Sequence, residues 1–260
     1  SKGKGGGIIC FLLYVLQLYN WFNVQALETP VVKKAVMFSP YYFGLKDAGE
    51  LYLKSALELR GYSVIPYLQT TQVETVGEKP KVANLDKFYY IIKSADWGVV
   101  FVSSHGSPQS MSVEAYKLSP LGERARDDAY DIYNDNELYK NKAYIKKSQS
   151  AHGNSISVTS KMIGEQAVMC QGAIVYLSTC HSGYPPDDGS IAGTFVGLGK
   201  ARNSFGYYHL SYSYYTRIDI ELLFGTMLGK HPIAGISSNY NVQQAYGLIT
   251  AHPIRTVDIH

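Results

Sequence analysis

Short, uninterrupted apolar runs recur along the chain and predict buried β-strands. They lie at residues 34–38, 97–102 and 173–177, and two weaker segments at 63–67 and 204–208 have a similar character. Strands that face water on one side alternate apolar and polar residues, whereas strands of a parallel sheet covered on both faces do not. The runs therefore favour a parallel sheet that is buried between two layers.

Apolar residues at helical spacing separate these runs and predict helices between the strands. Residues 48–60 place Tyr52, Ala56 and Leu59 on one face and end before Gly61, a residue type that is favoured just after a helix. The same spacing marks three further segments, at residues 85–95, 191–200 and 220–228. The alternation predicts an α/β fold: an open, mostly parallel sheet with right-handed crossovers and helices on both faces.

One long segment interrupts this rhythm. Residues 107–165 stand between two predicted core strands and are polar, charged and rich in tyrosine. A connection of this length is uncommon in a compact domain, so we expect an insertion with helices of its own. It is interpreted either as a solvated decoration or as a lid or cleavable linker over the functional site.

Composition narrows the class of protein without identifying it. The chain has 260 residues, of which 46% are hydrophobic and 17% charged, and this excludes a disordered chain. The net charge of +3 is small and evenly spread, so no nucleic-acid partner is expected. Three cysteines without a CxxC pair, and histidines without ligand spacing, predict no metal site and no cofactor. The oligomeric state stays open.

The N-terminal residues 1–26 have a pattern of their own. Two lysines precede an apolar stretch at residues 8–16, and residues 24–26 carry small side chains at the two positions that a signal peptidase recognises. The pattern predicts a secretory signal peptide, with a retained membrane anchor or a buried helix as alternatives. We therefore expect a single domain at residues 27–260 in a secreted or extracytoplasmic protein, associated with a membrane only if the segment is retained.

Reactive residues follow two of the predicted core strands. His105 and Gly106 come after the strand at 97–102, and Cys180 comes after the strand at 173–177. Ligands of open α/β sheets bind beyond the carboxyl ends of the strands. An imidazole can take a thiol proton and later protonate a leaving amine, and the N–H groups of Gly106 and Cys180 can form an oxyanion hole. The pattern predicts acyl transfer from an amide to Cys180, followed by hydrolysis.

The two strand ends resemble those of the caspase-fold cysteine peptidases, a group that includes caspases, metacaspases, gingipains and separase-type domains. The segment at 180–183, Cys-His-Ser-Gly, is most similar to the corresponding segment of metacaspases. The resemblance implies a caspase-like fold over roughly residues 33–230. It also implies that His105 is the base and Cys180 the nucleophile of an endopeptidase, here a secreted one, that cleaves polypeptides.

The sequence departs from the metacaspase pattern at positions that bear on specificity. Ser104 stands where metacaspases usually have glycine, and Ser178 stands where they usually place an aspartate that binds a basic substrate side chain. Asp187 and Asp188 could supply that charge instead, or they form a polar turn. Specificity for a basic side chain is therefore an open question at this point.

Other residues carry alternatives. Tyr207 and Tyr208 form either a wall of the substrate groove or a half-exposed strand and loop. His152 lies in the long polar segment without a preceding apolar strand and is interpreted as a loop residue. A disulfide between Cys170 and Cys180 would silence the nucleophile. The competing function is a catalytically silent α/β binding module that uses the same sheet edge.

Overall fold

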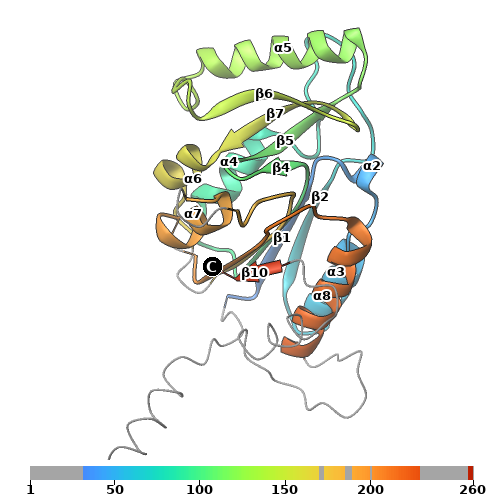
Figure 1. The fold of residues 1–260 in the computed structure, drawn as a ribbon, viewed down its shortest axis with the longest axis vertical. Coiled ribbons are helices and arrows are strands. Elements are labelled where there is room, and N and C mark those ends of the chain that lie inside the picture. Colours follow the sequence, from blue (N-terminus) through green and yellow to red (C-terminus); the bar gives the residue numbers. More distant parts are fainter. Residues whose placement is uncertain (1–31, 170–172, 185–188, 200, 229–256, 260) are drawn as a thin grey trace, which may run out of the picture.

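The computed structural model describes residues 32–169, 173–184, 189–199, 201–228 and 257–259, and these form a central six-stranded sheet (Figure 1). The strand order is β10-β9-β8-β3-β1-β2, and every neighbouring pair is parallel except β9 and β10. The strands are β1 (Lys34–Ser39), β2 (Ser63–Leu68), β3 (Val99–Ser103), β8 (Ile174–Ser178), β9 (Asn203–Tyr207) and β10 (Val257–Ile259).

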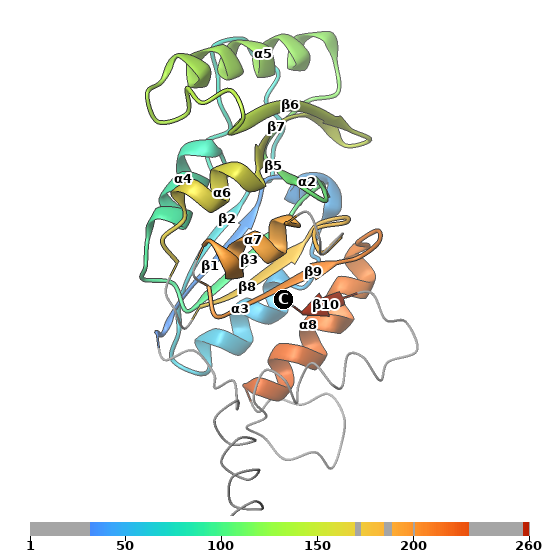
Figure 2. The same ribbon diagram turned by 60° about the vertical axis from the view of Figure 1, so that its left-hand side comes forward.

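Helices cover both faces of this sheet (Figure 2). On one face lie α3 (Glu50–Glu58) and α8 (Ser213–Met227). On the other lie α4 (Leu85–Lys93), α6 (Ser160–Gln166) and α7 (Ile191–Gly197). A short helix, α2 (Tyr42–Leu45), follows β1. The predicted α/β class, with a mostly parallel sheet flanked by helices, is confirmed.

The apolar runs fill two cores because successive strand residues point to opposite faces. In β1, Ala35 and Met37 pack with α3 and α8, whereas Val36 and Phe38 pack with the helices of the opposite layer. Every residue of β3 and of β8 is buried. This two-sided burial explains why the runs show no polar alternation.

The end of α3 agrees with the prediction that Gly61 stops it. Gly61 has a φ of 80°, a left-handed value that glycine adopts without strain. The N–H of Gly61 donates to the Glu58 carbonyl at 3.0 Å, and the N–H of Tyr62 donates to the Leu57 carbonyl at 3.1 Å. These two bonds form a Schellman motif, which satisfies carbonyls that the helix leaves free. The chain then turns directly into β2.

Between β3 and β8 the chain forms a second, antiparallel sheet with the order β4-β5-β7-β6. Its strands are β4 (Gly106–Ser107), β5 (Ser110–Tyr116), β6 (Ile145–Ser150) and β7 (Gly153–Thr159). The helix α5 (Pro120–Asp135) packs on this sheet, at the top of Figure 1. The sequence predicted helices in this region, and the strands were missed because serine recurs in β5, β6 and β7 and interrupts their apolar sequence.

A buried carboxylate ties α5 to the second sheet. Glu114 of β5 accepts hydrogen bonds from the hydroxyls of Tyr116 and Tyr133, each at 2.5 Å, and from the N–H of Leu85 at 2.8 Å. Burial raises the pKa of Glu114, and the three donors oppose that effect. Because Tyr133 belongs to α5 and Leu85 begins α4, this one side chain connects three elements.

The predicted signal segment at residues 1–26 lies outside the described residues. The helices that are described are all too short or too polar to cross a membrane.

Candidate active site

The register of β3 and β8 brings the two predicted strand ends together. Ser103 pairs with Ser178 in the last pair of these parallel strands, and the N–H of Ser104 donates to the Ser178 carbonyl at 3.1 Å. His105 and Cys180 each lie two residues beyond that pair. They therefore emerge at the same edge of the sheet, as neighbouring parallel strands require.

Gly106 lies where the segments that follow β3 and β8 come close to each other. A Cβ at this position would lie 2.9 Å from the Cβ of Thr179 and 3.2 Å from the carbonyl oxygen of Cys180. A larger residue would push the turn that carries Cys180 away from β4. Glycine is thus needed here because Thr179 and Cys180 approach closely, rather than for an unusual φ angle.

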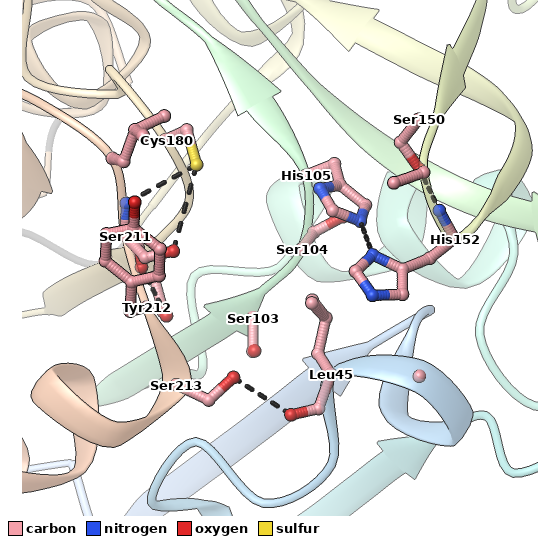
Figure 3. Close-up of a pocket in the computed structure, with 14 residues that line it drawn as sticks. Leu45, Ser103, Ser104, His105, Ser150, His152, Cys180, Ser211, Tyr212 and Ser213 are labelled. Atoms are coloured by element: carbon pink, nitrogen blue, oxygen red, sulfur yellow. Dashed lines mark hydrogen bonds between the residues drawn. The ribbon is translucent and has the colours of Figure 1, made fainter.

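His105 and Cys180 lie on opposite sides of a hollow of about 500 Å³ (Figure 3). No Asp, Glu, Lys or Arg is found among the described residues around this hollow, so its wall is uncharged apart from its histidines and thiol. The lining comes from α2 (Gly44, Leu45), the end of β3 (Ser103, Ser104, His105), the β6–β7 turn (Ser150, Ala151, His152), the end of β8 (Ser178, Cys180) and residues around the start of α8 (Leu210, Ser211, Tyr212, Ser213).

The imidazole of His105 is packed between two rings. Tyr41 meets it edge-on, with 4.6 Å between the ring centroids, and the ring of His152 lies beside it, with 5.0 Å between the centroids and 18° between the ring planes. Nε2 of His105 lies 2.9 Å from Nδ1 of His152, a hydrogen bond whose direction depends on the tautomers. Burial, and after it the neighbouring His152, lowers the pKa of His105 from 6.5 to about 4. At neutral pH the His105 ring is therefore uncharged and carries a lone pair.

Cys180 is a partly buried free thiol. The N–H of Ser211 donates to its Sγ at 3.4 Å, and the Sγ lies 3.8 Å from the Ser211 carbonyl oxygen. Within the described residues, the thiol is bonded to Ser211 and the imidazole to His152, so the two groups face the hollow without a direct hydrogen bond between them. Cys170 lies outside the described residues.

His181, the residue after Cys180, is held in an uncommon conformation. His181 has a φ of 55°, in the left-handed region that side chains other than glycine rarely adopt. Its N–H donates to the His209 carbonyl at 2.8 Å, and its Nδ1 lies 3.1 Å from the Tyr208 carbonyl oxygen. The turn after β8 is thus tied to the end of β9, which fixes the place where Cys180 leaves the sheet.

Ser178 belongs to a cluster of three hydroxyls beside the hollow. Its Oγ lies 3.1 Å from the Oγ of Ser211 and 3.0 Å from the Oγ1 of Thr216. Ser178 and Ser211 line the hollow, whereas Thr216 is buried behind them. Ser178 therefore presents uncharged hydrogen-bonding groups to the hollow.

The prediction that Tyr207 lines the substrate groove is wrong. Its side chain is fully buried, and its hydroxyl donates to Asp219 at 2.9 Å and lies 3.1 Å from the hydroxyl of Tyr176. Tyr208, the next residue, points the other way and is exposed beside Tyr184, with 4.6 Å between the ring centroids. Asp187 and Asp188 lie outside the described residues.

His152 is the site residue that sequence reasoning missed. The sequence placed it in a loop, and it does lie in a turn, the one between β6 and β7. That turn reaches the hollow, where His152 meets His105 and packs against α2. Only its pairing with a following glycine could have drawn attention to it, because the partner of a hairpin turn is set by tertiary structure.

Histidines and cysteines can also bind metal ions, and the described residues contain no cluster of three or more His, Cys, Asp or Glu side chains with that potential. Neither a comparison with models of protein families nor one with curated proteins finds a match to this sequence.

Proposed function

We propose that the protein is a caspase-like cysteine endopeptidase in which Cys180 is the nucleophile and His105 the general base. The observation that carries this proposal is the β3–β8 register, which brings a thiol and an uncharged imidazole to one uncharged hollow at the carboxyl edge of the sheet. His105 takes the proton of the thiol, and sulfur bonds to the carbonyl carbon of a peptide. The proton then passes to the leaving amine, and water hydrolyses the thioester.

The oxyanion of the tetrahedral intermediate is assigned to the N–H groups of Gly106 and Cys180. The N–H of Ser112 donates to the His105 carbonyl at 2.9 Å, so the next pair of that ladder, Gly106 and Met111, exchanges no hydrogen bonds. The Gly106 N–H therefore points away from β5 and remains available to a ligand. Because Gly106 lies against Thr179 and Cys180, both N–H groups belong to one small region.

The surface around the dyad suits an extended polypeptide. A second hollow of about 170 Å³ adjoins the first and shares His105 and Ser150 with it, so a groove continues past the base. Tyr212 is exposed and borders the hollow, and the exposed rings of Tyr184 and Tyr208 pack together close to His181. The hydroxyls of Ser178 and Ser211 favour an uncharged substrate side chain beside the scissile bond.

The proposal also assigns the second sheet and the chain termini to parts of a caspase-like domain. Residues 107–165 would be an insertion of the caspase-like domain, and the lid interpretation is favoured because the β6–β7 turn contributes to the hollow. The domain would span residues 27–260. Residues 1–26 would direct the protein out of the cytoplasm. Its substrate would be a polypeptide outside that compartment.

A peptide library separates this function from the alternatives. We expect the purified protein to cleave a subset of a mixed peptide library, and we expect Cys180→Ala to abolish cleavage while the circular dichroism spectrum stays unchanged. Cys170→Ala is the matched control, because it removes another thiol and should keep activity. Equal lack of turnover in wild type and Cys180→Ala, before and after limited proteolysis, would reject the peptidase.

A catalytically silent binding module is the second candidate. Two observations favour it: the thiol and imidazole are not directly hydrogen-bonded, and the pKa of about 4 makes His105 a weak base. In that case peptides from the library bind to the groove without being cleaved. Isothermal titration with peptides that the wild type retains but does not cleave identifies this outcome.

A further inference from the structure

We infer that His152 is a positioning residue that selects the reactive tautomer of His105, so that Cys180, His105 and His152 act as a linear triad. The inference rests on the proposed function, and it concerns a contact between the two sheets. His105 follows a strand of the central sheet, whereas His152 comes from the β6–β7 turn of the second sheet. Figure 3 shows the two rings side by side at the hollow.

The turn that carries His152 is anchored on several sides. The N–H of His152 donates to the Oγ of Ser150 at 3.2 Å, and its carbonyl accepts from the Nε2 of Gln72 at 3.0 Å. A Cβ on Gly44 of α2 would lie 3.1 Å from the Cδ2 of His152, so the ring fits closely against that helix. These contacts hold the imidazole where its Nδ1 reaches Nε2 of His105. The hydrogen bond between the two rings is therefore fixed by the surrounding structure.

The hydrogen bond between the two rings allows two arrangements of one shared proton. In the first, Nε2 of His105 carries the shared proton and donates to His152, so Nδ1 of His105 has a free lone pair. In the second, His152 donates, and Nδ1 of His105 carries a proton and can accept none. Nδ1 is the ring nitrogen on the side of Cys180 in Figure 3. Only the first arrangement gives a base that faces the thiol.

The same bond stabilises the charge that forms during the reaction. When Cys180 reacts, its S–H bond breaks and the proton forms an N–H bond at Nδ1 of His105. The resulting imidazolium donates its Nε2–H to the lone pair on Nδ1 of His152, and such a charge-assisted bond is stronger than a neutral one. The Nδ1 proton later moves to the leaving amine. His152 therefore takes part without gaining or losing a proton in the net reaction.

Two substitutions isolate this role. His152→Phe keeps a flat aromatic ring beside His105 but lacks the nitrogen that accepts the bond. His152→Asn places an amide oxygen near the position of Nδ1 and keeps an acceptor. We expect His152→Phe to lower kcat by about tenfold to a hundredfold with little change in KM, the scale seen when a group that orients a functional imidazole is removed. We expect His152→Asn to retain most of the wild-type kcat.

A spectroscopic measurement tests the inference without relying on turnover. Two-bond ¹H–¹⁵N correlation spectra of histidine-labelled wild type at pH 7 report which nitrogen of each ring is protonated. We expect His105 to carry its proton on Nε2, and we expect a mixture of tautomers in His152→Phe. A wild-type His105 protonated on Nδ1 would overturn the inference, and so would an unchanged kcat in His152→Phe or an equal loss in both variants. If wild type and Cys180→Ala are equally inactive, the peptidase proposal fails, while the spectra still decide the tautomer.

Discussion

At the scale of single residues, Ser178 keeps the part of the hollow beside Cys180 uncharged. It is the last residue of β8, it is buried, and its hydroxyl shares hydrogen bonds with Ser211 and Thr216. Hydroxyls both donate and accept hydrogen bonds, so the cluster can satisfy an amide or hydroxyl on a substrate. It offers no charge to balance that of a lysine or arginine, whose burial without a partner costs several kcal/mol, about 3 or more.

A carboxylate at this position should reverse the preference. We expect Ser178→Asp to raise kcat/KM for a lysine before the scissile bond, relative to glutamine, by about tenfold or more, because an opposite charge now meets the buried ammonium group. The hydroxyls of Ser211 and Thr216 can donate to the new carboxylate. Ser178→Ala is the control, since it removes the hydroxyl without adding charge, and it should keep the wild-type ratio. An unchanged lysine-to-glutamine ratio in Ser178→Asp contradicts this assignment of the substrate pocket.

The residues of the candidate site were predictable to different degrees. His105 and Cys180 could be found because each follows an apolar run, and the ends of neighbouring parallel strands meet. Tyr207 and Tyr208 are adjacent residues of the same type, yet Tyr207 ends β9 and is buried whereas Tyr208 lies just beyond the strand and is exposed, and only the structure shows this difference. His152 could not be found because its position depends on where a hairpin of the second sheet comes to lie.

At the scale of elements, a buried carboxyl joins the end of β1 to the start of α3. The hydroxyl of Ser39 donates to one oxygen of Glu50 at 2.7 Å, and the N–H of Ala48 donates to the other at 2.5 Å. Burial raises the pKa of Glu50 from 4.5 to about 7, although both hydrogen bonds oppose this. The folded protein therefore keeps a proton on Glu50 at a pH where the unfolded chain has lost it.

Because of this proton, the free energy of unfolding depends on pH. Between about pH 4.5 and 7 the folded state binds more protons at Glu50, so its contribution to the free energy of unfolding falls as pH rises. The full effect is about 3 kcal/mol, since each pKa unit corresponds to about 1.4 kcal/mol. His105 acts in the opposite direction, because its pKa is lowered to about 4 and its contribution falls as pH drops.

Glu50→Gln isolates the contribution of this one group. We expect the variant to gain stability relative to wild type as pH rises from 5 to 8, because glutamine cannot ionise. Urea unfolding at a series of pH values gives the free energy of unfolding of each protein as a function of pH. The contribution of His105 is the same in both proteins and cancels in the difference between the two curves. Glu58→Gln, at an exposed position of the same helix, is the control and should follow the wild-type curve. Parallel curves for wild type and Glu50→Gln would show that Glu50 does not titrate in this range.

The elements of the central sheet were largely predictable, and those of the second sheet were not. Strands buried on both faces require continuous apolar sequence, and the helices between them require apolar residues at helical spacing, so both leave clear patterns. The strand β6 (Ile145–Ser150) reads IKKSQS and has one buried residue, which leaves almost no such pattern. β5 and β7 bury serines against one another, with the Oγ of Ser112 lying 3.1 Å from those of Ser155 and Ser157. Such hydrogen-bonded polar burial cannot be recognised from hydropathy.

At the scale of the whole molecule, the candidate site exists only where the two sheets meet. The central sheet supplies His105 and Cys180, and the second sheet supplies His152 through the β6–β7 turn. Gly153 follows His152 in that turn with a φ of 152°, and a Cβ there would lie 2.3 Å from the Tyr116 carbonyl oxygen. No rotation of a side chain relieves such a contact, so any larger residue must move the turn away from β5.

Gly153→Ala therefore tests whether the site depends on both sheets. We expect it to lower the free energy of unfolding by about 1–3 kcal/mol, the range for strain at a special backbone position. At a temperature where the variant is fully folded, turnover should still fall at least tenfold, because the His152 ring no longer reaches His105. Gly197→Ala is the matched control: a Cβ on this exposed residue of α7 meets nothing within 4 Å, and alanine favours a helix. If folded Gly153→Ala and Gly197→Ala cleave peptides equally fast, the central sheet carries the activity alone, and the turn of the second sheet only covers it.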